Sequence, residues 1–251
     1  NRAAIAKYLK FSYVPHPLSI FKGISKLPPA HILCMNFNNN SEAIFPYWTL
    51  SSTVNTNYSN YDSIIETLHN NLNKSVADQM VADVPVGAFL SGGIDSSLIV
   101  SLMQKNSKRP INTFTIGYQD TVYDESLYAS SVAQHLGTNH TELIVSPQDL
   151  LSVVPKLPSL YDEPFADSSQ VPTFLVSQLA RNTVTVALTG DGGDEVFGGY
   201  NRHLWTNNVW NNIRQLPQWL KFSISKILST PSVNRWNKIY SLLEFIIPRR
   251  Y

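Results

Sequence analysis

The sequence holds a single cysteine, Cys34, among 251 residues. One thiol can neither close an internal disulfide nor build a thiolate metal cluster, so the sequence excludes both kinds of scaffold. Charged residues make up only 15% of the chain, and the formal net charge is +1. This balance gives no broad attraction to nucleic acid or to a membrane surface, and we expect neither as a partner.

Long apolar runs are also missing. No stretch approaches the roughly 18 residues that predict a transmembrane helix. The N-terminal residues 1–4 include no initiator methionine and do not resemble a signal peptide. A reducing, cytoplasmic setting fits this composition. The last residues, 246–251, do not resemble a natural stop, so we expect a chain cut off at both ends of a longer product.

Hydrophobic residues make up 43% of the chain, which is enough for a sizeable core. The first part, residues 1–50, reads as a helix at 3–11 followed by a hairpin of strands at 31–37 and 43–48. We expect it to be the remnant of a β-rich domain. A polar stretch at 51–60 predicts a linker, and the second domain then covers 51–251.

From residue 84 onward, short apolar strands alternate with helices. The predicted strands are 86–90, 111–118, 141–145 and 184–188, and the predicted helices are 61–80, 95–105, 124–136 and 171–181. This alternation predicts an α/β fold with a doubly wound parallel sheet, whose ligands bind at the carboxyl ends of the strands. The segment 205–251 reads as helical, and its tryptophans predict a core or an interface.

One loop carries the strongest chemical signal, Ser91-Gly92-Gly93 between a buried strand and a helix. Glycines allow a close backbone approach, and the helix start adds a positive dipole end. Hydroxyls follow at Ser96 and Ser97. A plain turn with Asp95 as a helix cap is the simpler alternative, but strand, loop, hydroxyls and helix together predict a phosphate or pyrophosphate site. The loop lacks the lysine of a Walker A sequence.

A second loop, residues 189–200, follows the predicted strand 184–188 and gathers acids among glycines. The acids are Asp191, Asp194 and Glu195. Crowded carboxylates repel one another unless a cation is shared, so an ordinary solvated acidic turn is the less favoured reading. A Mg²⁺ ion held jointly by Asp95 and Asp194 would relieve the repulsion and clamp a pyrophosphate leaving group.

The first loop resembles the signature of the N-type ATP pyrophosphatases, or PP-loop enzymes, which split ATP between the α- and β-phosphates. Together with the second loop it resembles the synthetase domain of glutamine-hydrolysing asparagine synthetases. Further segments carry the same likeness, at 83–87, 114–118, 123–126, 135–140 and 162–169. Residues 1–48 resemble the end of that family's N-terminal glutaminase domain.

The resemblance implies a role for each matching residue. The nucleotide and its pyrophosphate would be bound by Leu90, Ser91, Gly92, Gly93, Asp95, Ser96, Ser97, Ile116, Thr189 and Gly190. The metal would be bound by Asp95 and Asp194. Asp191 stands where many members have a glutamate that assists the attack of ammonia, and it is shorter by one methylene. The stretch 162–169 is the candidate for aspartate recognition. The family's N-terminal cysteine nucleophile is replaced here by Asn1, and we expect Cys34 to be a buried apolar filler.

The resemblance therefore implies ATP-dependent amidation of L-aspartate to L-asparagine, with ammonia supplied from glutamine. ATP and Mg²⁺ are the expected cofactors, and a homodimer is compatible. Two alternatives stay open. The same chemistry could act on another carboxylate, such as a sugar acid or a β-lactam precursor, or the chain could be a non-catalytic nucleotide-binding module.

Overall fold

The computed structural model describes residues 1–50, 60–119 and 124–243. The chain divides into two compact units, Asn1–Asp191 and Gly192–Tyr251. Nearly all of the predicted linker at 51–60 lies outside the described residues. The predicted division into domains 1–50 and 51–251 therefore stays a prediction.

A parallel sheet forms the centre of the first unit, with its strands in the order β5-β4-β3-β6. The strands are β3 (Val86–Phe89), β4 (Asn112–Tyr118), β5 (Asn139–Val145) and β6 (Val186–Leu188). Ala88 pairs with Thr113 on one side and with Leu188 on the other. The chain steps outward from β3 to β5 and then returns to place β6 on the other side of β3.

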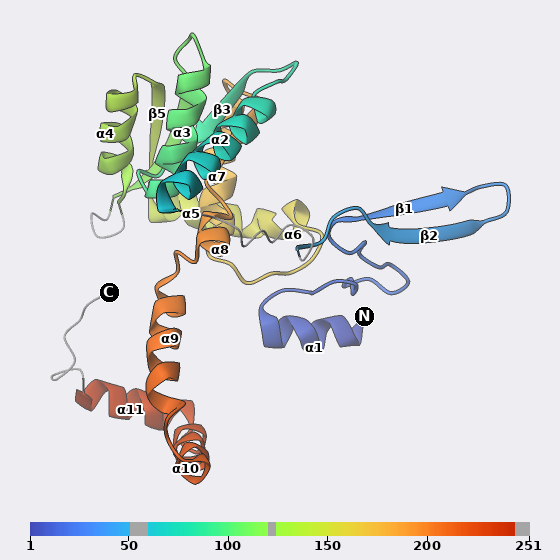
Figure 1. Cartoon of the computed structure of the whole chain (residues 1–251), viewed down its shortest axis with the longest axis vertical. Coiled ribbons are helices and arrows are strands. Elements are labelled where there is room, and N and C mark those ends of the chain that lie inside the picture. The colour runs from blue at the N-terminus through green and yellow to red at the C-terminus, as the bar shows by residue number, and fades with distance from the viewer. Residues whose placement is uncertain (51–59, 120–123, 244–251) are drawn as a thin grey trace. The chain divides into compact units, whose positions relative to one another are not determined.

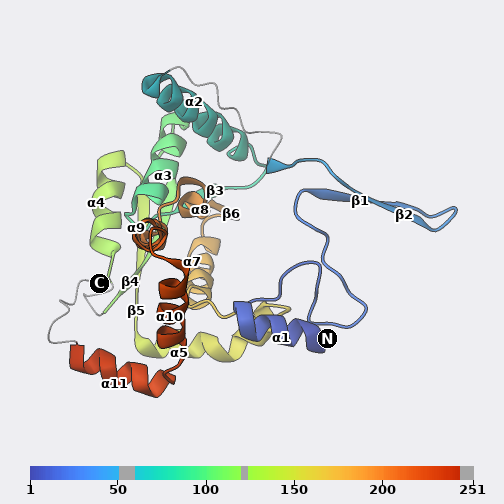
Figure 2. The same cartoon turned by 60° about the horizontal axis from the view of Figure 1, so that its bottom comes forward.

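Helices cover both faces of this sheet (Figures 1 and 2). One face packs against α2 (Tyr61–Gln79), α3 (Ile94–Asn106) and α4 (Ser126–Leu136), around Ala88 and Leu90. The other face packs against α5 (Pro147–Val153) and α7 (Gln170–Arg181), around Phe114 and Val145. The doubly wound α/β prediction is confirmed.

The direction of α7 follows from its contacts with the sheet. Val171 and Phe174, near its start, pack in the cluster that holds Ile116 and Tyr118 at the end of β4. Ala180, near its end, packs against Phe114, which lies earlier in that strand. The helix therefore runs antiparallel to the strands, and its N-terminus lies at their carboxyl edge. Between α5 and α7 the chain forms a 3-10 turn at Val154–Lys156 and a short helix α6 (Leu157–Leu160).

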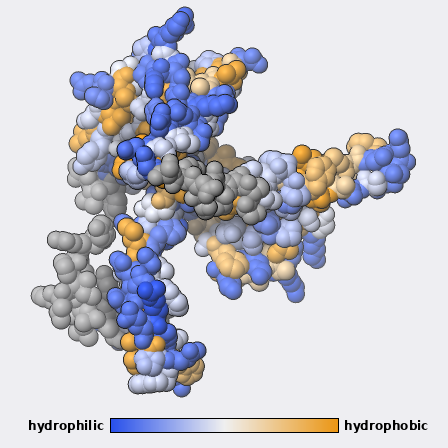
Figure 3. Space-filling model, in the orientation of Figure 1, coloured by the Kyte–Doolittle hydropathy of each residue, from blue (hydrophilic) through white to orange (hydrophobic). Residues whose placement is uncertain are grey.

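The N-terminal part forms α1 (Arg2–Phe11) and an antiparallel hairpin of β1 (His31–Asn36) and β2 (Ser41–Pro46). The predicted helix and hairpin are thus confirmed. The prediction that Cys34 is buried is wrong, because Cys34 is exposed on β1. Among the described residues no layer covers the hairpin, and hydrophobic side chains lie open along it (Figure 3).

The burial predicted for the strand at 184–188 and for the helix at 61–80 also differs from what the structure shows. The strand predicted at 184–188 begins at Val186, which is 43% exposed because β6 is an edge strand. The apolar face of α2 is buried only near its end, at Val76, while Ile65 is 48% exposed. No described helix is long and apolar enough to cross a membrane.

The second unit is helical, as predicted. Its helices are α8 (Gly193–Phe197), α9 (Asn201–Ile213), α10 (Gln218–Ser229) and α11 (Val233–Leu243). The tryptophans do not form a core within its described residues, since Trp205 and Trp219 are each 69% exposed.

Candidate nucleotide-binding site

The loop after β3 is closed by its own hydroxyl groups. The Ser91 amide donates to Ser96 Oγ at 3.2 Å, and the two serine hydroxyls lie 3.0 Å apart. The Gly93 amide donates to Ser91 Oγ at 3.3 Å. The predicted hydroxyl donors Ser91 and Ser96 therefore also shape the loop that presents them.

The loop leads directly into the N-terminus of α3. Gly93 is the N-cap residue of α3 and, as a glycine, has no side chain with which to cap the helix. Ser97 makes the first intrahelical bond, to the Gly93 carbonyl at 3.1 Å. The amides of Ile94, Asp95 and Ser96 precede that bond, so this end of the helix offers backbone donors and a positive dipole end to an anion.

Gly92 is required by both its conformation and its surroundings. Its φ is +81°, and an added Cβ would lie 2.6 Å from the Tyr128 Cβ and from the Ala129 amide. The loop is thus pressed against the first turn of α4. No side chain fits at this position without displacement of that turn.

The structure brings the loops after β3 and β6 together. A Cβ at Gly190 would lie 2.7 Å from the Ser96 amide nitrogen and 2.9 Å from the Asp95 carbonyl carbon. β3 and β6 are neighbours at the point where the strand order reverses, which is where doubly wound sheets bind ligands. Thr189, which precedes Gly190, accepts from the Asp191 amide at 3.2 Å.

Ser97 adds a polar group that lacks a partner. Its Oγ is buried and has no hydrogen-bond partner among the described residues. Buried hydroxyls are normally bonded, so an unpaired one beside a candidate phosphate loop is a natural donor for a ligand oxygen.

The predicted acids lie in different surroundings. Asp95 is half-buried in the first turn of α3, and Asp191 is exposed. Asp194 lies in α8 of the second unit, half-buried, with its carboxylate against Gly199. In the described parts of the chain, ion pairs join Lys26 to Glu163 and Lys74 to Asp78, and neither involves these three acids.

The described residues contain no group of three or more histidine, cysteine or acidic side chains arranged to hold a metal ion. This does not conflict with the predicted Mg²⁺, because that ion is commonly held by one or two carboxylates together with substrate phosphates. The shared binding of Mg²⁺ by Asp95 and Asp194 stays a prediction.

Leu90 and Ile116 lie on opposite faces of the sheet. The Leu90 side chain is 1% exposed in the cluster with α3, whereas Ile116 packs toward α5 and α7. The Leu90 amide donates to the Phe114 carbonyl at 2.9 Å. These residues support the carboxyl edge of the sheet from both sides, and their predicted contacts with the nucleotide stay a prediction.

Sequence reasoning missed the role of Asp124 at the same edge. Its carboxylate accepts from the Tyr118 amide at 3.3 Å and from the Ser126 amide at 3.0 Å. The hydrogen bonds from Ser126 lower the pKa of Asp124 below its ordinary value. Asp124 thereby ties the end of β4 to the start of α4, and an acid two residues before a helix was the available signal.

A cavity of about 550 Å³ lies on the α2 and α3 face of β6. Its lining includes Leu72, Val76, Ile99, Leu188, Thr189 and Asp191. The cavity reaches the second loop at Thr189 and Asp191. Its lining does not include Ser91, Gly92 or Gly93.

The stretch 162–169 leads into the N-terminus of α7 and is folded back upon it. Gln170 Nε2 donates to the carbonyls of Phe165 and Asp167, at 2.9 and 2.8 Å. Asp167 accepts from the Ser169 amide at 2.8 Å, which lowers the pKa of its carboxyl. Because α7 starts at the carboxyl edge of the sheet, this candidate acceptor stretch lies at the same edge as the two loops.

The sequence of the chain is similar to known proteins of one family. The family model described as asparagine synthase matches residues 67–250. A Methanocaldococcus jannaschii protein, provisionally named glutamine-hydrolyzing asparagine synthetase 2, is 37% identical over 97% of this chain and 47% of its own length. Glutamine-hydrolyzing asparagine synthetase 1 of Bacillus subtilis is 32% identical over 80% of this chain and 31% of its own length. The chain thus spans about a third to a half of these curated relatives.

Among solved structures, the chain is similar to glutamine-dependent NAD⁺ synthetase from Acinetobacter baumannii in complex with ADP. The identity is 17% and the TM-score 0.41, over 67% of this chain and 31% of that one. NH3-dependent NAD synthetase from Campylobacter jejuni gives 14% identity and a TM-score of 0.38, over 54% of this chain and 60% of that one.

Proposed function

Since the chain belongs to the asparagine synthase family, we propose that it binds ATP and activates the side-chain carboxylate of L-aspartate as an aspartyl-adenylate. Ammonia then replaces AMP and gives L-asparagine. The observation that supports this proposal most is the contact of Gly190 with the Asp95–Ser96 backbone. It joins the glycine loops of β3 and β6 into one site at the switch point of the sheet.

The backbone supplies most of the proposed phosphate site. The backbone amides at the start of α3 and the loop at Gly92–Gly93 would bind the pyrophosphate oxygens. The buried Ser97 hydroxyl would donate another bond. Leu90, Ile116, Thr189 and Gly190 would hold the nucleoside at the strand ends. Such fixed donors act by positioning the reactants and by stabilising the charge that develops on the leaving group.

Asp95 and Asp194 are the proposed ligands of Mg²⁺. Their carboxylate oxygens suit a hard cation, and neither forms an ion pair with a described cationic side chain. When bound, Mg²⁺ would neutralise charge on the departing pyrophosphate. Asp95 would also orient the triphosphate from the first turn of α3.

Asp191 is the proposed helper of the ammonia step. It directly follows Gly190 and is exposed, so its carboxylate is available to orient ammonia. The attack forms the carbon–nitrogen bond, breaks the bond from the acyl carbon to the AMP oxygen, and releases a proton from nitrogen. Asp191 would accept this proton.

In the parent protein, glutamine would supply the ammonia. The support is the likeness to glutamine-hydrolyzing relatives over residues that include α1 and the β1–β2 hairpin. We propose these residues as the end of the glutaminase domain.

A panel of carboxylic acids tests the proposal. The chain is incubated with Mg²⁺, ATP, ammonium and one acid at a time, and the phosphorus species are followed by NMR. AMP and pyrophosphate that appear with aspartate, and that are lost in Asp95→Asn, agree with the proposal. The same products with a different acid would keep the chemistry and change the acceptor. ADP with orthophosphate would reject cleavage between the α- and β-phosphates.

A further inference from the structure

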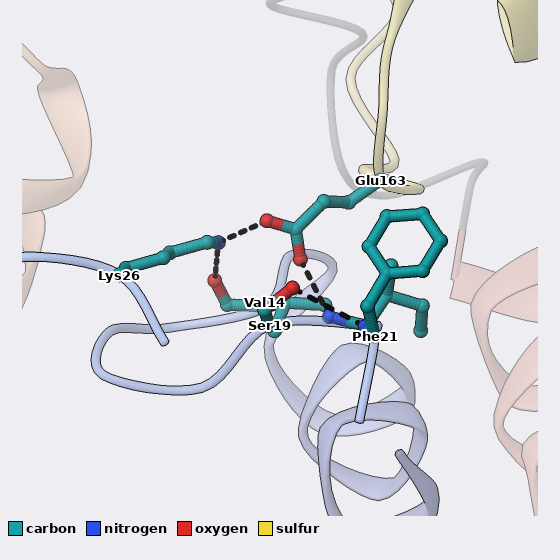
Figure 4. A network of polar contacts seen from close by, with 6 residues as sticks. Val14, Ser19, Phe21, Lys26 and Glu163 are labelled. Carbon is teal, nitrogen blue, oxygen red and sulfur yellow. Dashed lines mark hydrogen bonds and ion pairs between the residues drawn. The ribbon is translucent and has the colours of Figure 1, made fainter. Parts of the chain in front are cut away.

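Glu163 connects two parts of the first unit that are 143 residues apart in sequence. One carboxylate oxygen forms an ion pair with Lys26 Nζ at 2.7 Å, and the other accepts from the Ile20 amide at 3.1 Å (Figure 4). Both oxygens are thus used by the segment 12–26, which follows α1.

Lys26 is itself fixed on this segment. Its ammonium group also donates to the Val14 carbonyl at 2.6 Å. The side chains of Lys26 and Glu163 are 36% and 21% exposed, so water only partly screens the pair. Nearby, the Ser19 hydroxyl accepts from the Phe21 amide at 3.2 Å and holds the turn that presents Ile20.

A backbone bond strengthens the same junction. The Ala166 amide donates to the Ser12 carbonyl at 2.6 Å. Ser12 is the C-cap of α1 and has a left-handed φ of 67°. The segment 12–26 therefore holds the chain at Glu163 and again at Ala166, on either side of Pro164 and Phe165.

The residues held in this way lead into the carboxyl edge of the sheet. Phe165 and Asp167 are hydrogen-bonded to Gln170 at the start of α7, whose N-terminus lies at that edge. We propose that Glu163 is a positioning residue. Through Lys26 and Ile20, it lets the N-terminal segment set the conformation of stretch 162–169 and hence the affinity for the acceptor acid.

The identity of the acceptor in this proposal rests on the proposed function, whereas the junction itself does not. The proposal gives segment 12–26 a role in binding the acceptor acid, and this role is separate from any supply of ammonia. Nucleotide binding would be unaffected, because the phosphate loop is built from β3, α3 and the loop after β6.

The test uses the full chain and the variants Glu163→Gln, Lys26→Met and the double variant. Glu66→Gln, an exposed carboxylate on α2, is the matched control. Amide hydrogen exchange is measured for peptides that cover 12–26 and 160–170. Each single variant should exchange about fivefold faster in both peptides. The double variant should exchange more slowly than the product of the two single effects, which is the rate expected for independent sites, because the two side chains act as one pair. Unchanged exchange in both single variants would overturn the junction.

Ammonia-driven turnover supplies the second readout. We expect the aspartate concentration for half-saturation to rise about fivefold or more in Glu163→Gln and Lys26→Met, with kcat and the Kd for ATP unchanged. Faster exchange with an unchanged half-saturating concentration would overturn the link to the acceptor. If no acid is consumed even by the unmodified chain, the proposed function fails, and the exchange data still decide on the junction.

Discussion

Gly190 lies against the first turn of α3, so close that a Cβ at this position would stand 2.7 Å from the Ser96 amide nitrogen. The two nearest atoms belong to the backbone of Asp95 and Ser96, which cannot move away as the end of a flexible side chain can. This contact brings together two loops whose sequence positions differ by almost a hundred residues.

Gly190→Ala should therefore separate the loops and weaken nucleotide binding. We expect the Kd for ATP in the presence of Mg²⁺ to rise at least about tenfold, roughly 1.4 kcal/mol. Gly192→Ala is the comparison, because its Cβ would enter open space although its φ is +90°. Equal losses in both variants would contradict a specific role for the close approach of Gly190 to α3. Calorimetric titration measures both.

Gly92→Ala should destabilise the first unit, because it combines a φ of +81° with a clash against the Tyr128–Ala129 backbone. Left-handed strain and overpacking together predict a loss of about 3 kcal/mol in the free energy of unfolding. Gly93→Ala is the matched control, since its Cβ would meet only Ser91 Oγ, at 3.3 Å. Urea unfolding should place the control within about 1 kcal/mol of the unmodified chain, and a similar loss in both would contradict the packing described for Gly92.

Asp95→Asn should reduce the benefit that Mg²⁺ gives to ATP binding. The measured quantity is the ratio of ATP affinities with Mg²⁺ and with EDTA, and we expect it to fall at least about tenfold. Asp62→Asn serves as the control, because Asp62 also lies in the first turn of a helix, α2. A ratio unchanged in Asp95→Asn would remove Asp95 from the metal site.

His140 should make stability depend on pH. Burial lowers its pKa below the ordinary value, with an opposing contribution from Glu142, and its Nδ1 lies 2.9 Å from Thr113 Oγ1. Below about pH 6.5 the His140 imidazole binds a proton in the unfolded chain, whereas in the folded chain it is still neutral. Stability from this group is thus complete above pH 6.5 and falls as the pH drops through the lowered pKa.

Unfolding by urea at pH 7.5 and at pH 5.5 measures this effect. The loss of stability between the two values should be smaller in His140→Asn than in the unmodified chain. His135→Asn, an exposed position on α4, should leave the loss unchanged. An undiminished loss in His140→Asn would assign the pH dependence to other groups.

Much of the sheet could be predicted from local signals. The apolar runs that form β3 and β4 are bounded by glycine, proline and polar residues, and the residues of α2 have apolar side chains at helical spacing. The sequence also marks the start of α5, because Ser146 and Asp149 form a capping box there. The predicted helices do not include this one.

Burial and pairing could not be predicted in the same way. Whether Cys34 and Val186 are covered depends on neighbouring layers and strand order, which no local pattern encodes. The contact of Gly190 with α3 needs β6 beside β3, and the pairing of Glu163 with Lys26 joins distant segments. The sequence motifs identified the two loops, and the fold explains why Gly190 and the start of α3 lie at one edge of the sheet.

Transfer of oxygen from the acid to AMP tests the central claim most directly. The chain is given Mg²⁺, ATP, ammonium and aspartate labelled with ¹⁸O in its side-chain carboxylate. The account predicts one ¹⁸O atom in the phosphate of AMP, because the carboxylate oxygen that attacks the α-phosphorus leaves with AMP when ammonia attacks the acyl carbon. Label in orthophosphate together with ADP, or AMP formed without label, would contradict the adenylate mechanism.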